Sequence, residues 1–104
     1  MSSEQARLEG RRFGQLVMKL IDEGKCNELL KLIQYEIDKR LADIEHEYGM
    51  ILTNIRTTVE QYLDRIYRFC VEGKKHEARK TTVELILYML NAMVNLLAQN
   101  QRPH

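Results

Sequence analysis

The hydrophobic residues of this chain recur mostly every three or four positions, which is the spacing of one face of an α-helix. In the first part of the chain the residues with this spacing are Phe13, Leu16, Val17, Leu20 and Ile21. Ser3 can cap such a helix at its start, and Gly24 follows it at a position where helices commonly end. The pattern therefore predicts a first helix over about residues 3–23.

A second apolar stripe is much longer and has a mean spacing of about 3.6 residues. Its members are Leu30, Ile33, Ile37, Leu41, Ile44, Tyr48, Ile51, Ile55, Val59, Leu63, Ile66 and Cys70. Gly49 lies on the flank of the stripe, and a glycine inside a helix costs only about 1 kcal/mol relative to alanine. The sequence favours one long helix over about 26–72, possibly kinked at Gly49. The alternative is two helices that share a phase and are joined by a turn at Gly49.

The third predicted helix runs from about residue 75 to 101, after Gly73 and before Pro103. Its polar residues after position 83 fall on one narrow strip that contains Glu84, Tyr88, Asn91, Asn95 and Gln99. Almost everything else from 83 to 97 is apolar. A helix that is apolar over most of its circumference needs neighbours on several sides.

Two geometric arguments predict self-association. A helix over 26–72 would be about 70 Å long, far beyond the size of a compact domain of this length. The third helix needs more neighbours than one chain can offer. We therefore expect an all-α protein with a single helical domain over 1–104, three helices per chain and a long central helix. Two copies would form a two-fold helical bundle, a coiled-coil-like homodimer.

The charge distribution supports this expectation. The 104 residues carry a net charge of only +1, which gives no overall attraction to nucleic acid or to an anionic membrane. Residues 26–48 hold six acidic and three basic residues, whereas residues 49–80 hold seven basic and four acidic ones. An acidic half followed by a basic half favours antiparallel pairing between two copies.

The two cysteines, Cys26 and Cys70, have no CxxC spacing, and the polar N-terminal residues lack the apolar core of a signal peptide. The most apolar run, residues 85–98, is shorter than the roughly 20 residues that span a membrane. We therefore expect a cytoplasmic protein with reduced cysteines and no membrane segment.

No pattern in the chain indicates catalysis. The neighbours Glu45, His46 and Glu47 would point to different faces of a helix and could not chelate a metal together. No glycine-rich phosphate loop occurs. The sequence predicts no enzyme, no metal and no cofactor.

The leading functional prediction is a non-enzymatic dimeric helical adaptor, regulator or chaperone that binds a partner protein through an apolar helical surface. Methionines beside a wide apolar helix suit an adaptable docking surface. The surface predicted for the partner or the dimer lies on the flank furthest from the polar strip. Its residues are Leu85, Met89, Ala92, Met93 and Leu96.

The alternative prediction is a regulator that binds nucleic acid. A dimer would present two copies of a basic elbow around residues 65–80, and affinity for nucleic acid rises with the number of cations presented. With one further arginine, the residues that would grip phosphates are Arg56, Arg65, Arg68, Lys74, Lys75, Arg79 and Lys80. Acidic residues interleave with these cations, which is also typical of an ordinary solvated surface.

Residues 16–45, LVMKLIDEGKCNELLKLIQYEIDKRLADIE, resemble the opening of the small helical flagellar export chaperones. In both, a helix ends in a short acidic turn with glycine and leads into a second amphipathic helix. Cys26 stands where those proteins tend to have an aromatic residue. The resemblance covers under a third of the chain and implies only a chaperone or adaptor role.

Overall fold

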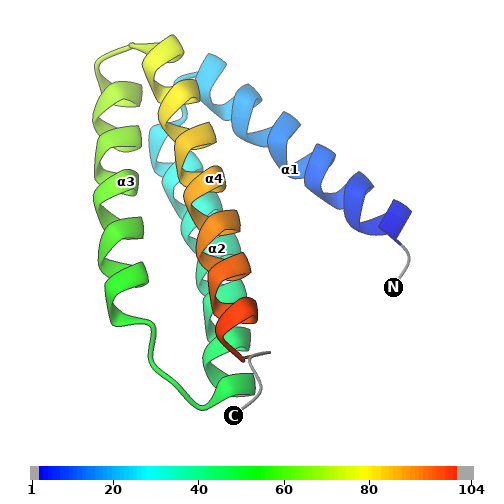
Figure 1. Cartoon of the computed structure of the whole chain (residues 1–104). Coiled ribbons are helices and arrows are strands. Elements are labelled where there is room, and N and C mark those ends of the chain that lie inside the picture. Colours follow the sequence, from blue (N-terminus) through cyan, green and yellow to red (C-terminus); the bar gives the residue numbers. More distant parts are fainter. Residues whose placement is uncertain (1–2, 101–104) are drawn as a thin grey trace.

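A computed structural model describes residues 3–100, and over these residues the chain forms four α-helices and no strand. The helices are α1 (Ser3–Asp22), α2 (Cys26–Tyr48), α3 (Thr53–Val71) and α4 (Lys75–Asn100). Helices α2, α3 and α4 run side by side as a bundle, and α1 leads away from one end of it (Figure 1). The all-α fold class predicted from the sequence is confirmed.

The prediction of one long helix over 26–72 is wrong, and the alternative of two helices in phase is confirmed. Helix α2 ends at Gly49, which has a φ of +62°, and α3 begins four residues later. Both the Gly49 and the Met50 N–H groups donate to the carbonyl of Glu45, and these hydrogen bonds close the last turn of the helix. The stripe continues in α3 because α2 and α3 bury their apolar faces against the same core. Its member in the turn does not follow it, because Ile51 is 82% exposed and Leu52 is buried in its place.

Charged groups hold the turn between α2 and α3. The Glu45 carboxylate accepts hydrogen bonds from the Leu52 N–H at 2.8 Å and from Arg56 Nη2 at 2.6 Å. Arg56 also pairs with Asp38, which lies two helical turns before Glu45 on α2. The Arg56 guanidinium, followed by the Leu52 N–H, lowers the pKa of Glu45 from 4.5 to about 2. The carboxylate of Glu45 raises the pKa of Arg56 in turn, so this arginine stays charged.

Because of this turn, the acidic half and the basic half of the sequence no longer predict antiparallel pairing between two copies. Arg56, the first basic residue after Gly49, pairs with two acidic residues of α2, Glu45 and Asp38, within one chain. Pairing between two copies is not required to match them. The length of the central helix likewise no longer argues for a dimer, because the described chain measures 50 × 31 × 19 Å.

Each helix contributes to one core. Its buried apolar residues are Val17, Leu20, Ile21, Leu29, Ile33, Leu41, Leu52, Val59, Leu63, Ile66, Cys70, Ala78, Leu85 and Met89. Two threonines of α4, Thr81 and Thr82, are also buried, and their hydroxyls donate to the carbonyls of Glu77 and Ala78. The burial of these polar side chains therefore leaves no hydroxyl unpaired.

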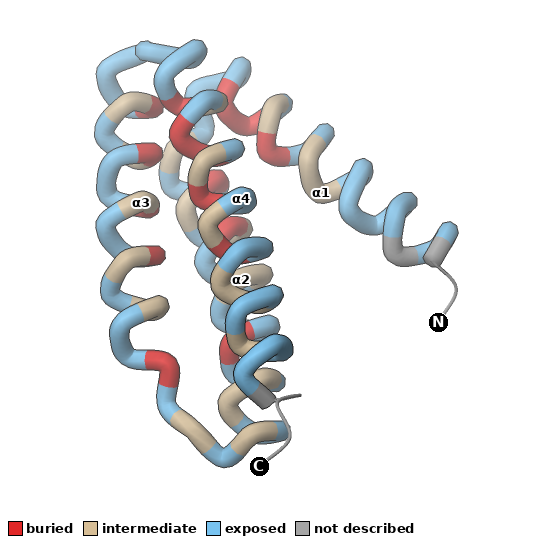
Figure 2. Tube along the Cα trace, in the orientation of Figure 1, coloured by how far each residue is buried: buried red, intermediate tan, exposed pale blue. Residues whose placement is uncertain are grey.

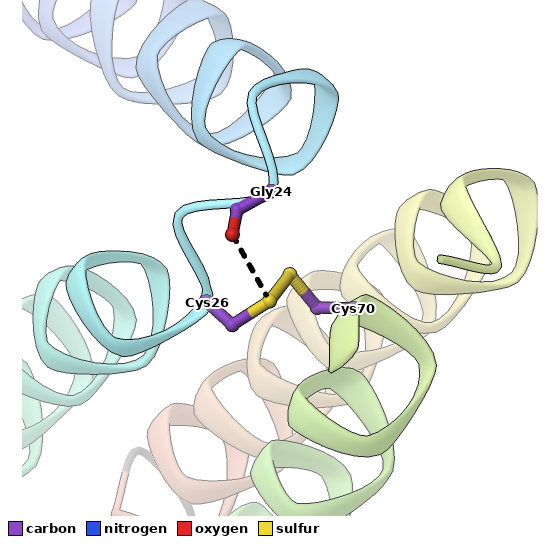
Figure 3. Close-up of a disulfide and its surroundings, with 3 residues drawn as sticks. All are labelled: Gly24, Cys26 and Cys70. Atoms are coloured by element: carbon purple, nitrogen blue, oxygen red, sulfur yellow. Dashed lines mark hydrogen bonds between the residues drawn. A yellow bond between two sulfur atoms is a disulfide. The ribbon is translucent and has the colours of Figure 1, made fainter. Parts of the chain in front are cut away.

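Cys26 and Cys70 are joined in a disulfide, which corrects the expectation that both are reduced (Figure 3). The bond links the start of α2 to the end of α3, with 5.7 Å between the two Cα atoms. The turn at Gly49 brings these residues together, since it folds the two ends of the predicted long helix onto each other. The spacing of the cysteines alone could not reveal this while the helix was taken as straight.

Helix α1 packs against the bundle only through its last two turns (Figure 2). Val17, Leu20 and Ile21 are buried there, whereas Leu8 and Leu16 are 44% and 43% exposed. The side chains described between residues 4 and 12 are all exposed. The N-terminal half of α1 therefore stands away from the rest of the chain (Figure 1).

Candidate interaction surface

Helix α4 carries six large apolar side chains on the side turned away from the core. They are 41–62% exposed: Val83, Ile86, Leu87, Leu90, Val94 and Leu97. At about 100° per residue, all six fall within an arc of about 100° on the helix. We call this set the α4 apolar face. From Leu85 to Gln99 no residue of the helix carries a charge.

Five of these residues have the spacing of a coiled-coil seam. Val83, Leu87, Leu90, Val94 and Leu97 alternate steps of four and three residues, as the a and d positions of a heptad do. The buried residues Leu85 and Met89 lie on nearly the opposite side of the helix. Helix α4 thus has one apolar side in the core and a second, ordered as a helix-packing seam, in solvent.

The surface predicted from the sequence overlaps the core. Leu85 and Met89 are 1% and 6% exposed, and Ala92, Met93 and Leu96 are partly buried. The α4 apolar face was missed because the surface was chosen by its distance from the polar strip, and at about 100° per residue this face lies at least as far from the strip as the predicted surface does. In the structure the polar strip lies beside α3. Glu84 pairs with Arg65 at 3.8 Å, and the ring centroids of Tyr88 and Tyr62 are 5.8 Å apart. The 4–3 spacing of the exposed residues was the signal that could have identified the face.

A cleft of about 320 Å³ lies between the splayed α1 and the rest of the bundle. Its apolar wall consists of Phe13 on α1, Ile37 on α2 and four residues of α4, and Glu36 and Arg40 stand beside it. The four residues of α4 are Ile86, Met89, Leu90 and Met93. Since Ile86 and Leu90 also belong to the α4 apolar face, cleft and face form one continuous surface.

The predicted basic elbow is largely neutralised within the chain. Arg56 is held by Glu45 and Asp38, Arg79 by Asp22 and Lys74 by Glu72. Arg65 pairs with Glu84 and lies over the ring of Tyr62, 5.7 Å from its centroid. Among residues 3–100, the predicted phosphate-binding cations without such an ion pair are Arg68, Lys75 and Lys80. The structure thus brings only part of this set together as open positive charge.

A further candidate site would be a group of side chains that binds a metal ion or carries out catalysis. No cluster of three or more histidine, cysteine, aspartate or glutamate side chains between residues 3 and 100 could hold a metal ion. His46 is exposed near the end of α2. That the protein is not an enzyme and needs no cofactor stays a prediction from the sequence.

Residues Lys75–Gln99 of α4 are long and apolar enough to cross a membrane by length and composition, with a mean hydropathy of 1.4 over the most apolar window. Only 22% of that window is buried. The core-facing side of the same helix packs against the bundle, and ion pairs from Arg79 and Glu84 join it to α1 and α3. The expected absence of a membrane segment stays a prediction.

Comparison with protein-family models, with curated proteins and with solved structures finds no match to this chain.

Proposed function

We propose that this chain is a non-enzymatic interaction protein that works as a homodimer, in which the α4 apolar faces of two copies pack against each other. One observation carries the proposal: six large apolar side chains lie exposed on one arc of α4, five of them at heptad spacing. Exposed apolar surfaces of this extent and order are typical of protein interfaces.

The area involved is consistent with self-association. From their exposed fractions, the six side chains expose on the order of 500 Å² per chain, so a symmetric pair would bury about 1,000 Å² through them alone. That value is at the lower limit for a specific interface. Leaving the same surface in water would forgo roughly 10 kcal/mol per chain, comparable to the stability of a small domain.

A second copy suits this surface better than a charged partner. The seam residues are two valines and three leucines, and identical helices with this spacing can interdigitate knobs into holes about a two-fold axis. Because the helix has no charge after Glu84, no like-charge contact opposes the approach of an identical helix along this stretch. The dimer would then act as an adaptor, regulator or chaperone for another protein, which is an expectation from the sequence.

The mass of variants in solution tests the proposal. In Leu90→Glu with Val94→Glu, two charges would enter the seam, and the variant should elute with the mass of one chain by light scattering at micromolar concentration. Glutamate is a better helix former than valine, so α4 should stay folded. Asn95→Glu places the same charge on the polar strip of the same helix and should leave the dimer intact. A dimer of the double variant with the mass of the wild type would overturn the proposed interface.

Nucleic-acid binding remains the alternative, with Arg68, Lys75 and Lys80 as its open cations. A salt titration of binding to duplex and single-stranded probes distinguishes it, since phosphate contacts weaken steeply with salt whereas an apolar dimer does not.

The localisation predicted from the sequence, the cytoplasm, also stays a prediction. The disulfide is more typical of an oxidising compartment.

A further inference from the structure

The N-terminal half of helix α1 stands away from the core of its own chain. Its described side chains before Phe13 are exposed. An isolated helical segment of three turns is marginal in water without a surface to pack on. Only the last two turns of this 20-residue helix pack in the core. We therefore expect its N-terminal half to pack against a second surface.

The side of α1 that faces α4 is shaped for close approach. Gly10 and Phe13 lie on this side, one turn apart, and line the cleft. A Cβ atom added at Gly10 would meet nothing within 4 Å, so the space in front of the helix is open. The opposite wall is formed by the apolar residues of α4 and by Ile37 of α2. The cleft thus has apolar residues on both walls, open space in front of Gly10, and two charged residues of α2, Glu36 and Arg40, at its side.

We propose that the cleft of each copy receives α4 of the other copy, so that α1 closes over the partner's α4. This inference rests on the proposed dimer and names the element that completes its interface. Ile86 and Leu90 belong both to the cleft and to the α4 apolar face. A second α4 packed on that face therefore lies directly beside the inner side of α1.

The area of the interface supports the participation of α1. The α4 apolar faces alone provide on the order of 500 Å² per copy, below the roughly 800 Å² per partner of a standard specific interface. The inner side of α1 and the cleft wall supply additional surface from residues that are already partly exposed. The occupant must also be an apolar helix without charge, because most of the lining is apolar, and α4 from Leu85 to Gln99 has that composition.

Photo-crosslinking in mixed dimers tests the arrangement. A benzophenone amino acid replaces Gly10 in the full-length chain, and this chain is mixed with ¹⁵N-labelled wild-type protein. We expect crosslinks between the unlabelled α1 and labelled peptides from residues 83–97. The same probe at Gln15, which is exposed on the other side of α1, should give no link to the labelled copy.

A substitution adds a quantitative readout. Gly10→Glu puts a charge into the open space and should weaken dimerisation about tenfold or more, because the charge would be buried against an uncharged helix. Gln15→Glu is the matched control and should leave the dissociation constant unchanged. Circular dichroism of both variants at a concentration where they are monomeric checks that α1 and the bundle remain folded.

The outcomes separate the two proposals. A dimer by mass without crosslinks from position 10, and with unchanged affinity in Gly10→Glu, would overturn the role of α1 and leave the α4 seam standing. A wild-type chain that is monomeric would overturn both. A monomeric chain that floats with phosphatidylcholine vesicles would show that the apolar surface meets lipid, and this too would overturn both.

Discussion

Glu45 is the side chain that determines how α2 meets α3. Its carboxylate joins the N–H of Leu52, ahead of α3, to the guanidinium of Arg56 in the first turn of that helix. Nearby, Gly49 adopts a φ of +62° that reverses the chain. The geometry of the fold at this end therefore depends on one charged hydrogen-bond cluster and one backbone conformation, and each can be tested separately.

The stability provided by Glu45 should depend on pH. Because the folded-state pKa is lowered from 4.5 to about 2, the contribution is complete above pH 4.5 and is lost as the pH falls towards 2. Glu45→Gln should melt at a lower temperature than the wild type at pH 7, and the difference should shrink below pH 4.5. A difference that stays constant down to pH 2 would show that the carboxylate charge is not what stabilises the turn.

Gly49→Ala should destabilise the fold by about 1–2 kcal/mol, since an L-residue with a side chain resists the left-handed conformation. The control is Gly14→Ala, in the middle of α1, where an added Cβ meets nothing within 4 Å and alanine favours the helix by about 1 kcal/mol. Urea unfolding of both variants should give changes of opposite sign. Equal stability of Gly49→Ala and the wild type would contradict the positive φ at this turn.

At the scale of helices, α4 has two apolar sides with different roles. Leu85 faces the core and is 1% exposed, whereas Leu87, two residues later, is 54% exposed. Leu85→Ala should lower the stability of the single chain by about 2–5 kcal/mol. Leu87→Ala should leave the stability of the monomer nearly unchanged and weaken the dimer. Denaturation and light scattering on both variants separate the effects, and the reverse result would exchange the two faces.

The disulfide also constrains the arrangement of the helices, because it links the start of α2 to the end of α3 across 44 residues of sequence. By the entropy of loop closure, its removal should cost about 4 kcal/mol. The variant with Cys26→Ala and Cys70→Ala should therefore unfold at markedly lower urea than the oxidised wild type. Reduced wild type should resemble the variant, and identical midpoints for all three would mean that the bond contributes nothing.

The helices of the chain were largely predictable, and so were two of their three connections; the break at Gly49 was not. Gly24 and Gly73 interrupt the apolar periodicity, so the ends of α1 and α3 could be placed within about a residue or two. Gly49 does not interrupt it, because α2 and α3 bury their apolar stripes in one core and the stripe continues in phase. The disulfide and the meeting of the two charged halves within one chain depend on this turn, and both were missed with it.

The same reason explains the displaced interaction surface. The predicted surface was placed by its distance from the polar strip of α4, and in the structure Glu84 and Tyr88 of that strip contact α3 through a charged group and an aromatic ring. Periodicity shows which residues share a face of a helix, and it does not show which face has a neighbour. For a helix that is apolar nearly all round, only the tertiary arrangement distinguishes core from interface.

At the scale of the whole molecule, residues 3–100 form a three-helix bundle with a projecting arm (Figures 1 and 2). The α4 apolar face is uncovered. The radius of gyration over Cα atoms is 14.9 Å, somewhat above the roughly 13 Å expected for a compact domain of this length. The arm accounts for the excess naturally, since half of α1 lies away from the core. Two copies that exchange their arms would cover the apolar side of both.

Sedimentation equilibrium of the unmodified chain, over a range of micromolar concentrations and at both low and high salt, tests the central claim most directly. We expect a mass of twice 12.3 kDa that persists at high salt, because the proposed contact between copies is apolar. A mass of 12.3 kDa across the whole range would contradict it.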